Sequence, residues 1–244
     1  MPIKIPLPDI TTEPVAKAHP FPLQVAYQTQ EFIQAILFHT MFSDVAAGEY
    51  VRLPNSLSGI RTTLVDQGMS AQLWEDGWKY LQKYQEYFSQ AILRSVLIST
   101  RSHWDWYVKK LGEFISQNRQ FVFDIPLSKT ESAKLRKIGF KEITQQIKIL
   151  EKSCDVSIPI QASTSELLHE MSLVRNLGLH NRWEIDAFYL SKTKTSEWLL
   201  NEVRNFDVAE LQSWHAALIN TISKTATPIA IKFKDSQIKE PIYD

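Results

Sequence analysis

The sequence has little cysteine, little glycine and no net charge, and each shortage excludes some classes of protein. Cys154 is the only cysteine, so the chain can form neither an intrachain disulfide nor a zinc site built from cysteines. The seven glycines include no Gly-rich phosphate-binding loop. The 27 basic and 27 acidic side chains cancel, which leaves no general electrostatic attraction to nucleic acid. Any RNA contact therefore requires a local patch or a groove between subunits.

Long hydrophobic runs are also missing. No apolar stretch reaches the roughly 18 residues that a membrane-spanning helix needs, and the N-terminus lacks the charged-then-apolar order of a signal peptide. With the lone cysteine, these absences predict a cytoplasmic protein without a membrane partner. The chain does contain 44% hydrophobic and 22% charged residues among 244, which is typical of a globular protein with a sizeable core.

The prolines divide the chain. Six of the 11 prolines lie in residues 1–22, which predicts an extended segment there. A helix is expected from about Gln28 to Ala47, with Gly48 as its stop, and residues 52–70 are expected to form a loop. We therefore predict an N-terminal extension over 1–70, a helical domain over 71–225 and a tail over 226–244.

Within the predicted helical domain, apolar residues recur with a period near 3.6. The stripe begins at Trp74 and continues to Phe114, and it fits either one long helix or two stacked helices, with Ser70 as the N-cap. The short stretch 120–125 is β-prone. The last apolar residues, Ile229, Ile231 and Phe233, suggest an edge strand.

Capping patterns mark the remaining helices. Pairs of Ser or Asp with Glu three positions later, or a lone Asp, predict helix starts at Ser128, Ser163, Asp186 and Asp207. The helices that follow are expected to end near Gly139, His180, Asn205 and Ser223, and another helix is expected over about 141–151. These elements predict an all-α fold, a helical bundle of four to five core helices with an extra N-terminal helix.

One segment carries groups suited to chemistry, Arg175-Asn176-x-x-x-His180. Arginine presents a permanent charge and a planar fork that matches phosphate, and histidine exchanges protons near neutral pH. Without a metal, this pair suffices for RNA transesterification: a base deprotonates the ribose 2′-hydroxyl, the oxyanion attacks phosphorus, and a cation stabilises the growing charge. DNA lacks the 2′-hydroxyl and would therefore resist cleavage by this reaction.

The spacing of the motif sets its geometry on a helix. Residues four apart nearly share a face, so Asn176 and His180 align, while Arg175 lies about 140° from His180. Gly178 predicts a shallow spot, so that Arg175 and His180 flank a helix–helix groove that a second, facing copy of the chain completes. A simpler interpretation stays open, in which Arg and His merely complement the helix dipole at a C-terminus and Asn181 follows the helix end.

The stretch from Glu170 to Asp186 resembles the signature helix of the HEPN superfamily, in which Arg and a polar residue precede a His. A second match lies upstream, where Ser102-x-x-Asp105 is followed by two aromatic residues. Family members often have Glu in place of Asp105, and this departure puts the role of that carboxylate in doubt. The resemblance covers roughly residues 75–222.

This resemblance implies a dimeric four-helix bundle with metal-independent endoribonuclease activity and no cofactor, often the toxin of a toxin–antitoxin pair or a defence nuclease. By the same resemblance, Arg175 binds the scissile phosphate, His180 acts as general acid or base, and Asn176 positions them. Asp105 and Ser102 orient the site, and Asn181 contributes to substrate binding. RNA, a second copy and an antitoxin protein are the implied partners.

Two other functions remain open from the sequence. The neutral charge and the Asp105 departure favour a catalytically inactive HEPN module that binds a nucleotide, RNA or a protein, and the third hypothesis is a purely structural helical adaptor. A basic run over Lys134, Arg136, Lys137 and Lys141 is read first as a solvated helix face and second as an RNA-guiding patch.

Overall fold

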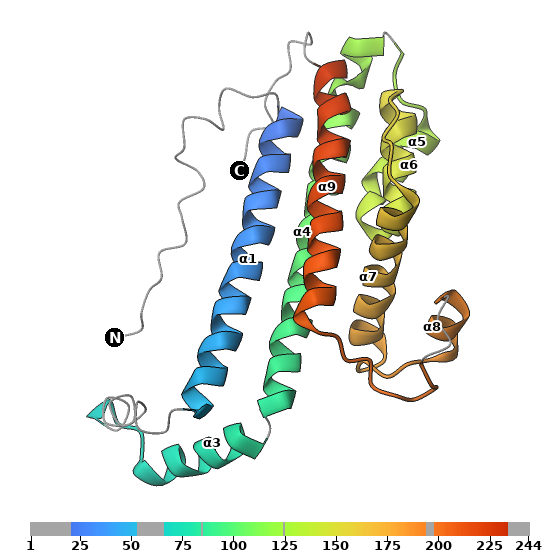
Figure 1. The fold of residues 1–244 in the computed structure, drawn as a ribbon. Helices are drawn as coiled ribbons and strands as arrows, with labels where there is room; N and C mark the ends of the chain where they lie inside the picture. The colour runs from blue at the N-terminus through green and yellow to red at the C-terminus, as the bar shows by residue number, and fades with distance from the viewer. Residues whose placement is uncertain (1–20, 53–65, 84, 124, 194–197, 234–244) are drawn as a thin grey trace. The chain divides into compact units, whose positions relative to one another are not determined.

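The computed structural model describes residues 21–52, 66–83, 85–123, 125–193 and 198–233. Over these residues it has eight α-helices, one 3-10 helix and no strand, so the predicted all-α fold is confirmed. The elements in Figure 1 are α1 Phe21–Arg52, α3 Ala71–Lys83, α4 Gln85–Phe123, α5 Lys129–Arg136, η3 Ile138–Phe140, α6 Ile143–Cys154, α7 Ala162–His180, α8 Ala187–Lys192 and α9 Val208–Lys232.

The chain divides into two compact units, each assembled from segments distant in sequence. Unit 1 comprises residues 1–33, 101–172 and 214–244, and unit 2 comprises 34–100 and 173–213. Helices α1, α4, α7 and α9 each contribute residues to both units. The three-part division predicted from the sequence stays a prediction.

Unit 1 is held together by aromatic packing between its helices. Phe114 of α4 stacks on Phe21 of α1 at a centroid distance of 5.1 Å and meets Phe233, just after α9, at 5.3 Å. The buried Tyr107 hydroxyl donates to the Ile222 carbonyl of α9 at 3.2 Å, and burial raises the pKa of this phenol well above its usual value. These contacts make unit 1 a helical bundle, because each joins α4 to another long helix.

Helix α1 begins earlier and ends later than its sequence suggests. It starts at Phe21 and runs to Arg52, so Pro22 lies in its first turn, where the missing N–H has no intrahelical partner to lose. Gly48 does not end the helix, which contradicts the predicted stop. The remainder of the Pro-rich segment, residues 1–20, and most of the predicted loop over 52–70 lie outside the described residues.

Three further boundaries differ from the prediction. Helix α4 continues to Phe123, so the stretch 120–125 is largely helical instead of β-like. Helix α8 ends at Lys192, well before Asn205. Helix α9 runs to Lys232 in place of an edge strand: Ala226, Ile229 and Phe233 are buried and lie at helical spacing, whereas Ile231 is 62% exposed. The apolar alternation had suggested a strand because these few residues fit both periods.

The predicted caps are confirmed at four of five positions. The Leu73 N–H donates to Ser70, and complete capping hydrogen bonds stand at Ser128, Asp186 and Asp207. Ser163 is not a cap, because α7 begins at Ala162 and the preceding turn already closes with Ser165 N–H donating to the Gln161 carbonyl. The apolar stripe from Trp74 belongs to two helices, α3 and α4, as one of the two sequence alternatives stated.

His215 of α9 gives unit 1 a pH-dependent stability. Its side chain is 1% exposed, and burial lowers the pKa of the imidazole from 6.5 to about 4. The unfolded chain takes up a proton below about pH 6.5 while the folded chain does so only near pH 4, so stability is present above this window and is lost as the pH falls through it. We expect a loss of about 2 kcal/mol between pH 8 and pH 5 from this group alone.

Urea unfolding at both pH values, for the native chain and for His215→Gln, measures this contribution. The native chain should lose about 2 kcal/mol more than the variant. Equal losses would show that His215 does not link protonation to folding.

Candidate functional site

Helix α7 and the turn after it carry the predicted motif. Val174 and Leu177 are buried and anchor the helix, and Leu177 also organises its end, because its carbonyl accepts from the backbone N–H of Asn181 at 2.8 Å and of Trp183 at 3.1 Å. Arg182 and Trp183 have φ values of 50° and 70°, in the left-handed region that non-glycine residues seldom adopt. The chain thus reverses sharply directly after His180, the last helical residue.

Arg175 and Asn176 form a linked polar pair on α7. The Nη1 atom of Arg175 donates to Oδ1 of Asn176 at 3.2 Å, and both side chains are partly buried. The Nε atom of Arg175 is buried and has no hydrogen-bond partner among the described residues. Such an orphaned donor costs free energy unless water or a ligand satisfies it, and because the atom is buried, a ligand would reach the guanidinium through its exposed part.

His180 lies at the opposite end of the motif. Its side chain is exposed, and among the described residues no hydrogen bond joins it to Arg175. The structure therefore brings Arg175 and Asn176 together and leaves His180 open to solvent at the helix terminus. An exposed imidazole there is free to exchange protons with a substrate that approaches from outside.

The space at Gly178 is filled by the chain itself. A Cβ built on Gly178 would lie 2.4 Å from the Trp183 ring, so the predicted shallow spot is occupied by that ring and is no open groove. The centroids of the Trp183 and Phe206 rings are 6.1 Å apart. The Arg94 guanidinium carbon lies 5.0 Å from the centroid of the Trp183 ring. Arg94, from α4, is a cationic residue near the motif that the sequence did not single out, because it lies inside an apolar stripe.

The contact between Gly178 and Trp183 predicts an unusual response to alanine. In most helices Gly→Ala stabilises by up to about 1 kcal/mol, and Gly77 of α3, with nothing within 4 Å of its would-be Cβ, is expected to show this gain. Gly178→Ala should lack the gain or destabilise by about 1 kcal/mol, since the indole must move. Urea midpoints of the two variants give the comparison, and equal stabilisation would contradict the packing described.

Asn181 closes the turn after α7. Its Nδ2 atom donates to the Glu184 carbonyl at 2.6 Å, and its own carbonyl accepts from the Glu184 N–H at 2.8 Å. This is the role of a residue that follows a helix end, one of the alternatives raised by the sequence. Its predicted part in substrate binding stays a prediction.

Asp105 and Ser102 lie on the part of α4 that belongs to unit 1. The Oδ1 atom of Asp105 pairs with Arg101 and accepts from Nε2 of Gln146 at 2.9 Å, while Oε1 of Gln146 accepts from the Trp104 indole at 2.5 Å. These bonds tie α4 to α6. Ser102 is exposed. The carboxylate of Asp105 thus already has structural partners, and the predicted role of Asp105 and Ser102 in orienting the site is untested.

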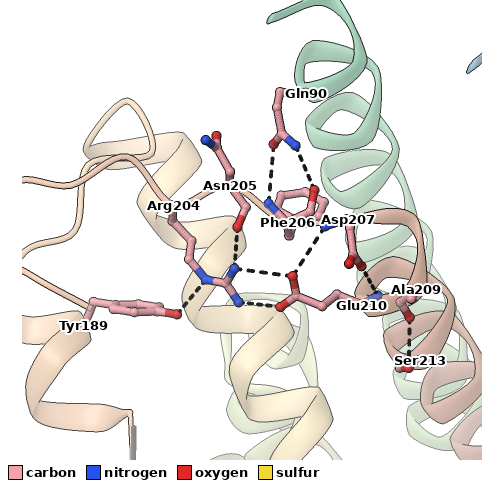
Figure 2. Close-up of polar contacts among 9 residues, drawn as sticks. All are labelled: Gln90, Tyr189, Arg204, Asn205, Phe206, Asp207, Ala209, Glu210 and Ser213. Atoms are coloured by element: carbon pink, nitrogen blue, oxygen red, sulfur yellow. Dashed lines mark hydrogen bonds and ion pairs between the residues drawn. The ribbon is translucent and has the colours of Figure 1, made fainter. Parts of the chain in front are cut away.

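An ion pair between the buried Arg204 and the partly exposed Glu210 organises unit 2, and no sequence pattern predicted it. Arg204 is 2% exposed, and its guanidinium donates to the Tyr189 hydroxyl at 3.1 Å, to the Asn205 carbonyl at 2.5 Å and to Oε1 of Glu210 at 2.6 Å (Figure 2). Burial opposes its charge, but the bonds to Glu210 and Tyr189 outweigh burial and raise the pKa of Arg204. No local pattern marks Arg204, because its partners lie on α8 and α9.

The Arg204 cluster fixes the loop that precedes α9. Glu210 also accepts from the Asp207 N–H, and the Gln90 side chain of α4 donates to the Phe206 carbonyl at 2.8 Å (Figure 2). Residues 183–185 pair with 201–204, where the Arg204 N–H donates to the Trp183 carbonyl at 2.8 Å. Trp183, beside the motif, is therefore held by the same loop that Arg204 anchors.

Comparisons with protein-family models, curated proteins and solved structures find no match to this chain. None of the helices in the described ranges is long and apolar enough to cross a membrane. Over those same ranges, no group of three or more His, Cys, Asp or Glu side chains is placed to hold a metal ion.

Proposed function

We propose that this protein is a metal-independent endoribonuclease of the HEPN type, acting in the cytoplasm as a toxin or a component of a defence system. The observation that carries the proposal is the state of Arg175. Its guanidinium is aligned by Asn176 and keeps a buried, unpartnered Nε, and an exposed His180 ends the same helix. An arginine with unused donors and a solvent-accessible imidazole on the same helix are the minimum that this chemistry requires.

In the proposed reaction, His180 removes the proton from the ribose 2′-hydroxyl. The resulting oxyanion attacks the adjacent phosphorus, and the bond to the 5′-oxygen breaks. Arg175 stabilises the charge on the phosphoryl oxygens, and Asn176 keeps the guanidinium aligned. The leaving 5′-oxygen takes up a proton from water and His180 returns its proton to solvent, so the products carry a 2′,3′-cyclic phosphate and a 5′-hydroxyl.

The proposal includes a homodimer. A single α7 presents one guanidinium and one imidazole from one helix, and a second copy would enclose the phosphate from the other side. The ring of Trp183 over Gly178 changes which surface such a copy meets, from backbone to indole. An antitoxin protein that covers this surface belongs to the same proposal.

A second candidate is a catalytically inactive HEPN module that binds a nucleotide, RNA or a protein. The specific observation that favours it is the engagement of Asp105, whose Oδ1 is held by Arg101 and Gln146. A carboxylate so committed has little capacity to orient an imidazole. This module would bind without cleaving.

The two candidates separate in one assay. Purified protein is incubated with RNA and a metal chelator, and the ends of any fragments are analysed. The ribonuclease proposal expects cleavage that the chelator leaves intact, with cyclic phosphate ends. Intact RNA at high protein concentration, with no inhibitor present, would favour the inactive module.

A further inference from the structure

The corner of unit 1 formed by α5, η3 and α6 holds a concentration of positive charge. Residues 129–154 contain seven Lys or Arg and three Glu in a chain of zero net charge, so this segment has a net charge of +4. All seven cations are exposed, and six of them, hereafter the basic surface, are Lys134, Arg136, Lys137, Lys141, Lys148 and Lys152.

Two of the three glutamates already accept hydrogen bonds from other groups of the chain. Glu131 accepts from the hydroxyl and the backbone N–H of Ser128 in the capping box, and these bonds lower its pKa. Glu151 accepts from the Ile158 N–H at 2.8 Å. The carboxylates keep their negative charge, but seven cations against three glutamates leave an excess of positive charge on this segment, and a polyanion is the complementary partner.

The charges are also grouped around a depression. Lys134 of α5 and Lys148 and Lys152 of α6 line one hollow together with Glu131, Ile149 and Ser153. Lysine ammonium groups bind phosphate as point charges, without the fixed geometry of arginine. Three of them around one hollow suit a phosphate of a polymer backbone.

Phe140 adds an aromatic ring to this surface. Its side chain is 90% exposed, and its neighbours in sequence include Lys137 and Lys141. The turn that carries it is fixed from within, because the Ile138 side chain is fully buried and the Ile138 carbonyl accepts from the Lys141 N–H and from the Gln146 side chain, both at 3.0 Å. The ring is thus held outward on a rigid turn.

We propose that this surface binds single-stranded RNA, with a base stacked on Phe140 and the adjoining phosphates held by the basic surface. The inference rests on the proposed ribonuclease function, for which it supplies a substrate-binding surface and a preference for unpaired RNA. A solitary ring among lysines is a stacking platform, since every base offers it a face. The cores of protein–protein interfaces are depleted in lysine, and membrane-surface helices need an extended apolar face, which a three-residue turn lacks.

The test measures binding separately from cleavage. A fluorescent short oligouridine with 2′-O-methyl groups cannot undergo attack by the 2′-hydroxyl, and its fluorescence anisotropy reports affinity. Phe140→Ala should weaken binding by about tenfold, whereas Phe38→Ala should not, although Phe38 is 74% exposed and has no lysine or arginine within four positions.

A second pair of variants tests the charges. Lys137→Glu/Lys141→Glu should weaken binding and reduce the salt dependence, the slope of log K against log salt falling by about 1.4. The control Lys79→Glu/Lys192→Glu makes the same change in net charge at two exposed lysines of unit 2 and should bind like the native chain. Thermal unfolding verifies that all variants fold.

The outcomes separate this inference from the proposed function. Affinity lost only in the basic-surface variants supports the inference even if no RNA is cleaved, in which case the nuclease proposal alone fails. Cleavage by native protein with unchanged binding in all variants overturns the inference and leaves the nuclease proposal standing. Phe140-dependent binding to phosphatidylserine vesicles without oligouridine binding would also overturn it, in favour of a membrane surface.

Discussion

Arg175→Ala and His180→Ala are each expected to lower RNA cleavage by about a hundredfold or more while the protein remains folded. A positioned acid or base contributes about 10²–10⁴ in rate, and a cation aimed at developing phosphoryl charge contributes a comparable factor. His180 is exposed and Arg175 only partly buried, with a hydrogen bond to its neighbour Asn176, so neither replacement removes core packing. Single-turnover cleavage of a labelled RNA provides the measurement.

Two further variants sharpen that experiment. His169→Ala removes another histidine from α7, outside the motif, and should cleave like the native chain. The double variant Arg175→Ala/His180→Ala should be about as slow as the worse single variant, because residues that act in one step are not additive. Full activity in either single variant would contradict the assigned roles.

Glu210→Ala is expected to destabilise the protein by about 3 kcal/mol. Arg204 is 2% exposed, and Glu210 forms an ion pair with it at 2.6 Å. Removal of Glu210 takes away the carboxylate that pairs with this buried cation, and the loop before α9 loses its link to the helix (Figure 2). Urea unfolding followed by circular dichroism measures the loss.

The matched control for this change is Asp207→Ala. Asp207 belongs to the same capping box, where its Oδ1 accepts from the Glu210 N–H at 2.8 Å, but it does not contact Arg204 in the described structure. Its loss should cost about 1 kcal/mol, as for an ordinary N-cap. If both variants lose the same stability, the cap alone matters and the buried pair contributes nothing.

Much of the fold follows from local patterns in the sequence. The all-α class came from helical periodicity, and the starts at Ser128, Asp186 and Asp207 came from caps whose hydrogen bonds involve residues three positions apart. These features can be predicted from the sequence because their physical cause lies within one turn of helix. The end of α7 at His180 has the same local origin, in the reversal that follows at Arg182 and Trp183.

The features that the sequence missed depend on partners far along the chain. No local pattern marks the backbone pairing of 183–185 with 201–204, and α9 extends to Lys232 because its last apolar residues face the core of unit 1. Gly178 has no side chain and therefore suggested an open groove. Only the folded structure shows that the Trp183 ring covers this position. For the candidate site, the sequence predicts the motif residues. Only the structure shows that the Nε atom of Arg175 is buried without a hydrogen-bond partner among the described residues.

The central claim is that a ribose hydroxyl, activated by His180, performs the cleavage while Arg175 of the same helix stabilises the phosphoryl charge. The most direct measurement places a single deoxynucleotide on the 5′ side of the cleaved bond in an otherwise unchanged RNA, with a chelator present. We predict that cleavage at that bond stops while neighbouring ribonucleotide bonds are still cut. Cleavage at the deoxy position at the native rate would contradict the account, because no 2′-oxygen would then be present to attack the phosphorus.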